Sequence, residues 1–500
     1  MDSFSSLEMR VLEENSEYLG VSKRLLMENA GRQIAEFCKK ILGSRKARIV
    51  VVAGPGNNGG DGFVAARYLS KFYEVDVFLA SDPGKIRTLE ARENWSILEK
   101  MKLTIRLHHG YDVENLEKLL EKSDLIIDAL FGTGLRGDIR EPYASIINRI
   151  NACSKEKIIV AVDLPSGLNP DTGDVHGVAV KADYTITFHA LKRGLLDRRE
   201  YTGEILVVDI GIPREVEFMA GPGDVIAVVK PRKAYSKKGD FGRILVIGGS
   251  RDYSGAPALS ALAALRTGAD LVTIAAPSSV ADVIKAFSPA LIVKKLSKEN
   301  LHIDDVDILL KLSMKSDAIV IGPGLGMSEE TQEAVVEYFS LIKNKPLVVD
   351  ADALKILSKH LELIREATAI LTPHAGEFKI LFGMEVPLNL KEKVSLVKKI
   401  ASENKIVILL KGHEDIVSDG ERVKVNYTGN PGMTVGGTGD VLSGIAATFL
   451  AWSNDAFHSA SAAAFINGLA GDLAVKKLGY HITPLDVIDK IPSAMKKYSI

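Results

Sequence analysis

The chain has 500 residues, and a prior of about 150 residues per domain predicts roughly two to four domains. With 46% hydrophobic and 25% charged residues, its composition is that of a globular protein, which excludes a disordered or fibrous chain. Its 63 Lys and Arg residues balance 64 Asp and Glu residues, so the formal net charge is -1. This balance argues against broad electrostatic binding to nucleic acid or to an anionic membrane.

The cysteine content and the absence of long apolar segments further restrict the kind of protein that this chain can be. Cys38 and Cys153 are too few for a zinc cluster or a disulfide framework, and we expect both to be small buried residues. The N-terminal residues lack the basic segment and apolar run of a signal peptide. The best apolar stretch, 444–452, falls far short of the ~20 residues that span a membrane. We therefore expect a cytoplasmic protein with neither a membrane nor a nucleic acid as partner.

Short β-branched apolar runs alternate with amphipathic stretches along the chain. Such runs, separated by helices, are typical of a parallel sheet covered on both faces, so the expected fold class is α/β. The runs expected to form strands are 48–53, 73–80, 125–129, 158–163 and 205–210, and then 243–248, 271–275, 318–321, 347–350, 369–371 and 406–410.

A Gly- and Pro-rich segment, 211–223, separates the two series of strands. Segments of this composition end regular structure and connect domains. We therefore expect two α/β domains, residues 1–211 and 225–500, joined by a linker at 212–224.

The motif GPGNNGGDG at 54–62 follows an expected strand and precedes an expected helix at 63–71. Its glycines let backbone N–H groups turn toward an anion at a helix N-terminus. The pattern G-x-G-x-x-G, with Asp76 near the end of the next strand, would suit a hydride-transfer enzyme. A tight turn without a ligand is a further alternative. The three glycines of the pattern are Gly54, Gly56 and Gly59.

Two features of this motif argue against the hydride-transfer alternative. Asp61 would place a carboxylate where a dinucleotide pyrophosphate needs positive potential. Asn57 and Asn58 are polar side chains that a dehydrogenase turn does not require.

Polar side chains also follow later strands, where ligands of open parallel sheets bind. Several oxygen ligands without cysteine suit a hard cation, whereas for any single Asp helix N-capping is an equal alternative. Lys192, in TFHALKRGL, is either an anion-binding group or a surface charge. The side chains expected at the sheet edge are Asn58, Asp61, Asp128, Asp163 and Ser166.

Four motifs over roughly 5–211 resemble the NAD(P)H-hydrate epimerase domain: LMENAG, GPGNNGGDG, DALFGTGLRGD and DLPSGL. The resemblance implies a domain with a Rossmann-like three-layer fold, which interconverts the R and S hydrates of NAD(P)H. It also implies a potassium ion at Asn58, Asp128 and Ser166. The implied hydrate contacts are Asn57, Asn58, Gly59, Gly60, Asp61, Gly132, Thr133, Gly134, Leu135, Arg136, Gly137, Asp138 and Asp163.

The chemistry of epimerisation is consistent with this set. The hydrate carries a hydroxyl on a ring carbon next to nitrogen, and that centre is flattened and rebuilt by loss and return of water. A carboxylate can act as acid and base in such a step. We expect Asp163 in this role, with Asp61 as the alternative.

The segment NPGMTVGGTGDVLSGIAATFLA at 430–451 places three glycines before Asp440 and a helix of small and apolar residues after it. Glycine-rich backbone at a helix N-terminus forms an anion hole. Asp440 can take a proton from a hydroxyl that attacks a phosphoryl group. The segment lacks the Gly-Lys-Ser/Thr of a P-loop. The alternative role for Asp440 is a helix N-cap.

Other polar segments follow the strands of the second domain. KGHED at 411–415 is placed to hold nucleotide phosphate or ribose, and GPGLG at 322–326 lets a ligand approach the backbone. Glu377 can position Mg²⁺ through water. His374, three residues before it, is expected to contact a ligand rather than to be structural. Asp350 and Asp352 end a further strand.

The second domain resembles the ribokinase-like superfamily and, more closely, the ADP/ATP-dependent NAD(P)H-hydrate dehydratase over roughly 225–500. IGPGLG, DADAL, TPHAGEF, LKGHEDIV and NPGMTVGGTGD carry this resemblance. Asp270 stands where the family has glycine, which puts local packing in doubt. The implied contacts are Ala258, Gly324, His374 and Asp440 to the S hydrate, and Lys411, Gly412, His413, Glu414, Asp415 and Gly439 to the nucleotide.

Together the two resemblances imply a bifunctional repair enzyme whose substrates are NADHX, NADPHX and ADP, with K⁺ and Mg²⁺ as metals. Asp440 would deprotonate the ring hydroxyl, ADP would phosphorylate it, and departure of phosphate would restore the double bond. The resemblance also suggests a homo-oligomer. The alternative is a small-molecule kinase fused to a Rossmann-like dehydrogenase or ligand-binding module.

Overall fold

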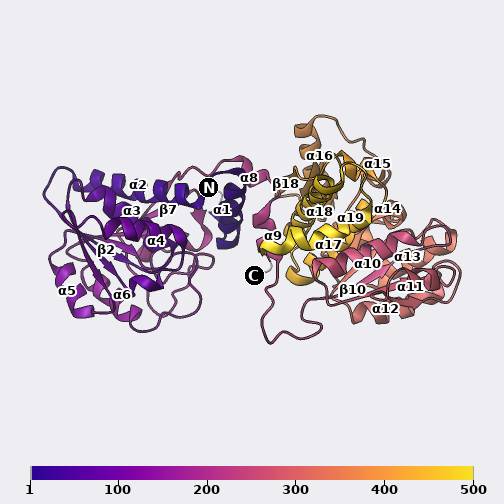
Figure 1. Cartoon of the computed structure of the whole chain (residues 1–500), viewed down its shortest axis with the longest axis horizontal. Helices are drawn as coiled ribbons and strands as arrows, with labels where there is room; N and C mark the ends of the chain where they lie inside the picture. Colours follow the sequence, from indigo (N-terminus) through magenta and orange to yellow (C-terminus); the bar gives the residue numbers. More distant parts are fainter. Residues whose placement is uncertain (1–2, 499–500) are drawn as a thin grey trace. The chain divides into compact units, whose positions relative to one another are not determined.

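The computed structural model describes residues 3–498 and divides into two compact units, Met1–Arg214 and Glu215–Ile500. Each unit is built on one large sheet with helices on both faces, so the α/β prediction is confirmed (Figure 1). No helix in the described part of the chain is long and apolar enough to cross a membrane. Cys38 is buried as expected, whereas Cys153 is partly exposed.

The division falls inside the segment expected to be a linker, but much of that segment is folded. Helices α8 (Glu215–Phe218) and α9 (Pro222–Val228) form part of the second unit. Asp224 in α9 is fully buried and accepts a hydrogen bond from the backbone N–H of Gly221, and its Oδ1 lies 3.0 Å from His458 Nδ1. These contacts fix α9 on the helical layer of the second unit.

The first unit has a seven-stranded parallel sheet of order β4-β3-β2-β5-β6-β7-β9, and β1 pairs with β8 beside it. All five expected strands are present, whereas β4 and β7 were not predicted. The strands are β1 (Ser3–Phe4), β2 (Arg48–Ala53), β3 (Glu74–Leu79), β4 (Ile105–His109), β5 (Leu125–Ala129), β6 (Ile158–Val162), β7 (Tyr184–Phe188), β8 (Leu191–Lys192) and β9 (Glu204–Val208).

Helices complete the three layers of the first unit. Apolar residues of α5 and α6 pack on one face of the sheet, and α3 packs on β2 and β5, with α2 and α4 against it. The helices are α1 (Ser6–Leu19), α2 (Lys23–Leu42), α3 (Asn57–Leu69), α4 (Leu89–Leu98), α5 (Val113–Glu121), α6 (Tyr143–Ala152) and α7 (Arg199–Thr202).

The second unit has a nine-stranded sheet of order β12-β11-β10-β13-β14-β15-β16-β17-β18, parallel except for the antiparallel pairs β16–β17 and β17–β18. All six expected strands are present. The strands are β10 (Arg243–Ile247), β11 (Leu271–Ala276), β12 (Ile292–Lys295), β13 (Ala318–Ile321), β14 (Leu347–Val349), β15 (Ala369–Leu371), β16 (Val407–Leu410), β17 (Asp415–Ser418) and β18 (Val423–Asn426).

Two layers of helices cover this sheet. One layer packs α9, α10, α17, α18 and α19 on one face, and α12 to α16 cover the other. The helices are α10 (Gly255–Thr267), α11 (Ala281–Phe287), α12 (Val306–Met314), α13 (Glu329–Leu341), α14 (Ala351–Leu357), α15 (Ala375–Phe382), α16 (Leu390–Asn404), α17 (Thr438–Ser453), α18 (Ala456–Leu478) and α19 (Pro484–Met495).

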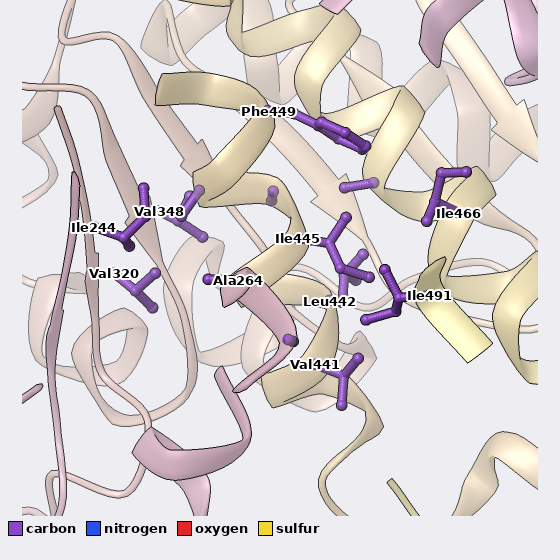
Figure 2. Close-up of a cluster of buried hydrophobic side chains, with 14 of the residues drawn as sticks. Ile244, Ala264, Val320, Val348, Val441, Leu442, Ile445, Phe449, Ile466 and Ile491 are labelled. Carbon is purple, nitrogen blue, oxygen red and sulfur yellow. The ribbon is translucent and has the colours of Figure 1, made fainter. Parts of the chain in front are cut away.

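Helix α17 lies at the centre of the second unit. Figure 2 shows its side chains Leu442, Ile445 and Phe449 among residues of the strands and of α10, α18 and α19. All its residues from 441 to 450 are buried, which matches an apolar sequence without a polar face. A Cβ on Gly444 would lie 2.1 Å from the carbonyl oxygen of Ser260, so α10 approaches more closely than any larger residue allows. This packing fixes the N-terminus of α17, where Asp440 lies.

Candidate active sites

The GPGNNGGDG motif starts a helix earlier than expected. Helix α3 begins at Asn57 rather than at residue 63, with Gly56 as its N-cap, so residues 57–60 form its first turn. A Cβ on Gly59 would lie 1.9 Å from the carbonyl oxygen of Gly54, which only glycine avoids. The first N–H groups of a helix lack partners within it, and such helix ends favour anions.

Three oxygen-bearing side chains meet beyond β2, β5 and β6. Asp128 is fully buried and accepts hydrogen bonds from the backbone N–H of Ser166 at 2.8 Å and from its hydroxyl at 2.6 Å. Burial raises the pKa of Asp128 to about 6, and no positive charge of the described chain counters it. The buried Asn58 Nδ2 has no hydrogen-bond partner among the described residues.

The loop 132–138 borders this cluster at its first residue only. A Cβ on Gly132 would lie 3.3 Å from Asn58 Oδ1, and the neighbouring Phe131 N–H donates to Ser166 Oγ at 2.9 Å. Gly134, Arg136, Gly137 and Asp138 are exposed. The structure thus brings Gly132 to the cluster and leaves most of the loop in solvent.

Asp163 directly follows β6 and is held in the left-handed region at φ 65°. Its Oδ1 accepts hydrogen bonds from Lys192 Nζ at 2.5 Å and from Thr187 Oγ1 at 3.2 Å. Lys192 is only 1% exposed, so the surface-charge alternative for it is wrong. Its buried charge instead neutralises and positions Asp163.

A pocket of about 70 Å³ opens beside α1, α2 and α3. Burial and the negative charge of Asp163 raise the pKa of Asp61 well above its usual value. Burial and the charge of Asp163 also raise the pKa of Glu13 to about 7. Sequence reasoning missed Glu13, because an acidic residue in an amphipathic helix is typical of a solvent-facing position. The pocket is lined by Glu13, Lys23, Leu26, Met27, Ala30, Asn57, Asp61, Glu90, Phe188 and Ile210.

Asp76, which the hydride-transfer alternative needs for a ribose, is already paired. Its carboxylate accepts two hydrogen bonds from Arg106 at 2.8 Å and lies 3.1 Å from His108 Nε2. Burial raises its pKa, but the hydrogen bonds from these partners and the charge of Arg106 outweigh burial and hold it well below the usual range. None of Asp61, Asp128 and Asp163 caps a described helix, so the N-cap alternative for them is wrong.

Asp440 lies in the first turn of α17, three positions after the N-cap Gly437, so its alternative role as the N-cap is wrong. Gly437 has φ 100°, a conformation that favours glycine. The Ser260 hydroxyl donates to the Asp440 carbonyl at 2.9 Å and fixes α10 against this turn. Burial, and then the negative charge of Asp350, raises the pKa of Asp440 to about 7.

Lys411 is the cation of the second site. Its Nζ donates to Asp350 Oδ1 at 2.9 Å and lies 3.8 Å from Glu377 Oε2. Burial lowers the pKa of Lys411, but Asp350 and Glu377 outweigh burial and raise it, so the charge persists. A Cβ on Gly439 would lie 3.3 Å from Lys411 Nζ, so the expected nucleotide residues Lys411 and Gly439 do meet. The sequence places Asp350 at the end of a strand but does not predict its pairing with Lys411.

His374 has a structural role at the start of a helix. It is the N-cap of α15, and its Nδ1 accepts hydrogen bonds from the N–H groups of Gly376 at 3.0 Å and Glu377 at 3.3 Å. Its Nε2 lies 3.4 Å from Glu377 Oε1, and its side chain is 59% exposed. The capping leaves only Nε2 to face a ligand.

The other residues of 411–415 differ in their surroundings. His413 is exposed, whereas Asp415 accepts hydrogen bonds from Gly412 N–H and Asn426 Nδ2, each at 3.0 Å. Burial raises the pKa of Asp415 to about 6. Glu414 lies 3.6 Å from Lys393. Asp415 therefore closes the turn that shapes this loop.

The expected hydrate contacts from α10 and the glycine loop lie near one another. Ala258 is in α10 and 3% exposed. Gly324 has φ 65°, and a Cβ there would lie 3.4 Å from Ala256 Cβ, in the first turn of α10. Asp352 Oδ2 accepts a hydrogen bond from Gly326 N–H at 2.9 Å and anchors this loop.

Asp270, which departs from the family pattern, is well accommodated. Its Oδ2 accepts hydrogen bonds from the N–H groups of Gly239 at 2.7 Å and Phe241 at 3.0 Å. Burial raises its pKa, but these N–H groups and Arg232 outweigh burial and lower it. The carboxylate thus fixes the loop before β10 rather than disturbing the packing.

Comparisons with known proteins cover both units. A family model described as NAD(P)H-hydrate dehydratase matches residues 244–493, and one described as YjeF-related protein N-terminus matches residues 23–194. The bifunctional NAD(P)H-hydrate repair enzyme of Pyrobaculum aerophilum is 46% identical over 100% of this chain and 99% of its own. That of Archaeoglobus fulgidus is 46% identical over 99% of each chain.

A solved structure is similar to the second unit. It is the ADP/ATP-dependent NAD(P)H-hydrate dehydratase from Bacillus subtilis co-crystallised with ATP/Mg²⁺, 29% identical over 56% of this chain and 98% of its own, with a TM-score of 0.49. The full-length matches decide against the kinase–dehydrogenase alternative. The chain belongs to the family of bifunctional NAD(P)H-hydrate repair enzymes and is an NAD(P)H-hydrate epimerase and dehydratase.

Proposed function

We propose that the first unit interconverts the R and S hydrates of NADH and NADPH at Asp163, and that the second dehydrates the S hydrate at Asp440 with ADP as phosphoryl donor. The observation that carries this division is that each unit holds a carboxyl under the influence of a lysine charge, buried in the first unit and partly exposed in the second. Asp163 is paired with Lys192 in one unit. In the other, the charge of Lys411 acts on Asp440.

The second unit supplies a base of suitable strength. The Asp440 carboxylate takes the proton of the ring hydroxyl, whose oxygen then bonds to the terminal phosphorus of ADP while the bond to the leaving AMP breaks. Departure of phosphate from the ring carbon, with loss of a ring proton, restores the double bond. A pKa of about 7 lets Asp440 accept this proton and release it near neutral pH.

Lys411, Gly412, His413, Glu414, Asp415 and Gly439 would hold the nucleotide. Lys411 stays charged beside Gly439 and therefore attracts phosphate to the N-terminus of α17. Glu377 and Asp350 add carboxylate oxygens next to Lys411, which suit Mg²⁺ bound through water. When bound, Mg²⁺ would neutralise phosphate charge during transfer.

In the first unit Asp163 would accept the proton of the water that returns to the flattened ring carbon. Lys192 stabilises the carboxylate form of Asp163 before the reaction. Asp61, whose pKa is raised, would hydrogen-bond the hydrate from the pocket that Glu13 also lines.

Potassium fits the cluster of Asn58, Asp128 and Ser166. The buried Asp128 carboxylate has no cationic partner in the described chain, and the amide of Asn58 has an orphaned group that oxygen replaces if the amide is turned over. Carboxylate, amide and hydroxyl oxygens are donors that hard cations prefer. Bound there, the ion would supply the positive charge that this carboxylate lacks.

Potassium should therefore stabilise the first unit. We expect the Tm of the first unit to rise with K⁺ concentration, relative to N-methylglucamine at equal ionic strength, because an ion that binds only the folded state stabilises it. Differential scanning calorimetry of the full chain measures this. Asp128→Asn should remove the dependence and Asp138→Asn, an exposed control, should keep it. A dependence that survives in Asp128→Asn would contradict this assignment.

The function is tested by repair of a mixed R and S hydrate of NADH with Mg²⁺, K⁺ and either ADP or ATP, followed by the absorbance of reduced nicotinamide. We expect full recovery with ADP, since both units act in sequence. Asp163→Ala should stop recovery at the S fraction, because the R hydrate is then not converted. Recovery that stops at the S fraction in the unaltered protein would reduce the first unit to a binding module.

A further inference from the structure

The carboxyl of Glu13 faces the pocket of the first unit without a partner. Glu13 lies in α1 and lines that pocket together with Asn57 and Asp61. Nearby Lys23 does not neutralise it, since Lys23 Nζ pairs with Glu14 at 2.5 Å and lies 3.5 Å from Glu17. Among the described residues, the Glu13 side chain has no hydrogen bond or ion pair. A partly buried carboxyl without a partner lowers the free energy of unfolding. Its presence in the pocket therefore indicates a functional role.

The segment that carries Glu13 is firmly attached to the catalytic side of the unit. Phe4 pairs with Lys192 in the β1–β8 ladder, so the strand that ends in the lysine paired with Asp163 also holds the N-terminal segment. The Ser5–Glu8 capping box starts α1, and Glu8 Oε2 accepts a hydrogen bond from Arg193 at 3.0 Å. These contacts fix α1, and therefore Glu13, relative to Lys192 and Asp163.

The charges around Glu13 set its protonation. Asp163 and Glu14 oppose its ionisation, whereas Lys192 and Lys23 favour it, and Asp61 and Glu90 line the same pocket. Because burial and Asp163 outweigh the lysines, the pKa of Glu13 rises to about 7. Glu13 is therefore present in both forms near neutral pH, which suits proton donation and acceptance.

Epimerisation needs two proton transfers. A proton must reach the hydroxyl that leaves as water, while the ring nitrogen lone pair forms a C=N bond. A second proton must leave the water that adds to the opposite face as that lone pair returns to nitrogen. Asp163, which accepts a hydrogen bond from Lys192, is suited to accept the second proton. The first proton requires a separate acid.

We propose that Glu13 is a further catalytic residue of the epimerase, the acid that protonates the leaving hydroxyl. In one direction Glu13 ends as a carboxylate and Asp163 as an acid, and solvent returns the proton between turnovers. In the other direction the two residues exchange roles. One water leaves and one returns, so no oxidant or co-reactant is needed. This inference rests on the proposed epimerase activity of the first unit.

The test compares Glu13→Gln with Glu14→Gln, its neighbour on the same helix. We expect Glu13→Gln to lower epimerase kcat by about 10²- to 10⁴-fold, with a smaller change in KM. Glu14→Gln should stay within a few-fold of the unaltered protein. Dehydration of the S hydrate by the same preparations should be unchanged, since that reaction belongs to the second unit.

Two further readouts separate catalysis from a structural role. In H₂¹⁸O each epimerisation should place ¹⁸O on the ring carbon, and Glu13→Gln should lose this incorporation to the same extent as kcat. In the direction that uses Glu13 as the acid, the unaltered protein should lose kcat/KM as pH rises through about 7, because the acid is then ionised. This decrease of kcat/KM with pH should be absent in Glu13→Gln and partly restored in Glu13→Asp.

The outcomes distinguish the inference from the proposed function. If the unaltered protein does not accelerate epimerisation, the proposed function of the first unit fails. If it does and Glu13→Gln equals it in kcat and ¹⁸O incorporation, Glu13 is not the acid. If the fluorescence of Trp95 shows that Glu13→Gln is unfolded, Glu13→Asp is measured in its place. The proposal would then be overturned if Glu13→Asp had an undiminished kcat and the same dependence of kcat/KM on pH as the unaltered protein.

Discussion

Replacing Asp440 by Asn is expected to lower the rate of dehydration by about 10²- to 10⁴-fold, the usual contribution of a positioned general base. The amide keeps the shape of the side chain at the start of α17 but does not accept the hydroxyl proton. Because Asp440 is not the N-cap of this helix, the substitution should leave the fold intact. ADP binding should be largely kept, since Lys411 and Gly439 are unchanged.

The measurement is reduced nicotinamide formed from purified S hydrate, with ADP affinity determined by calorimetry. Asp455→Asn is a matched control, because Asp455 caps α18 and asparagine caps equally well. Unchanged dehydration would remove Asp440 from the mechanism. An unfolded second unit would instead give this carboxyl a structural role.

The pH dependence follows from the same group. Burial raises the pKa of Asp440 to about 7, and a base acts only when ionised. The dehydratase kcat/KM should therefore rise as pH increases through about 7 and level off above it. In Asp440→Asn the remaining rate should lack this rise.

Replacing Lys192 by Met is expected to cost the first unit about 3–5 kcal/mol of unfolding free energy, because it leaves the buried charge of Asp163 without its partner. The substitution also removes the hydrogen bonds from Nζ to Thr187 and Phe188. Epimerase activity should be lost with the geometry of Asp163. The second unit should keep its stability and its dehydratase activity.

The two tryptophans make this measurable, since Trp95 lies in the first unit and Trp452 in the second. In a Trp452→Phe background, urea unfolding followed by Trp95 fluorescence reports the first unit alone. Arg193→Met is the control: its side chain is 52% exposed and pairs with Glu8, so about 1 kcal/mol or less is expected. Adding Asp163→Asn to Lys192→Met should recover part of the loss. A loss below 1 kcal/mol in Lys192→Met would contradict the pairing.

Both catalytic proposals depend on one property of parallel sheets, that their strand ends share an edge. Asp128 lies near the end of β5 and Asp163 follows β6, and Asp350 and Lys411 follow β14 and β16. Chain segments far apart in sequence therefore bring their first polar residues together. In each unit the result is a lysine that is charged among carboxyl groups.

The sequence by itself determined the α/β class, the two series of strands, the strand-end position of Asp163 and the position of Asp440 at the start of a helix. These features are local, because apolar runs bounded by polar or glycine-rich segments form strands whatever lies around them. Strands β4 and β7 escaped prediction because polar residues interrupt their apolar pattern, as in IRLHH and YTITF. The early start of α3 escaped because its first turn, NNGG, has low helix propensity and is retained by packing.

Only the tertiary structure decided which polar groups lose water and which charges meet. Lys192 and Glu13 lie in segments whose composition is equally typical of a solvent-facing surface, yet one is buried against Asp163 and the other faces the pocket. The partnership of Lys411 with Asp350 likewise joins two strands 61 residues apart. Protonation follows from desolvation and neighbouring charges, and both are set by contacts between distant segments rather than by local pattern.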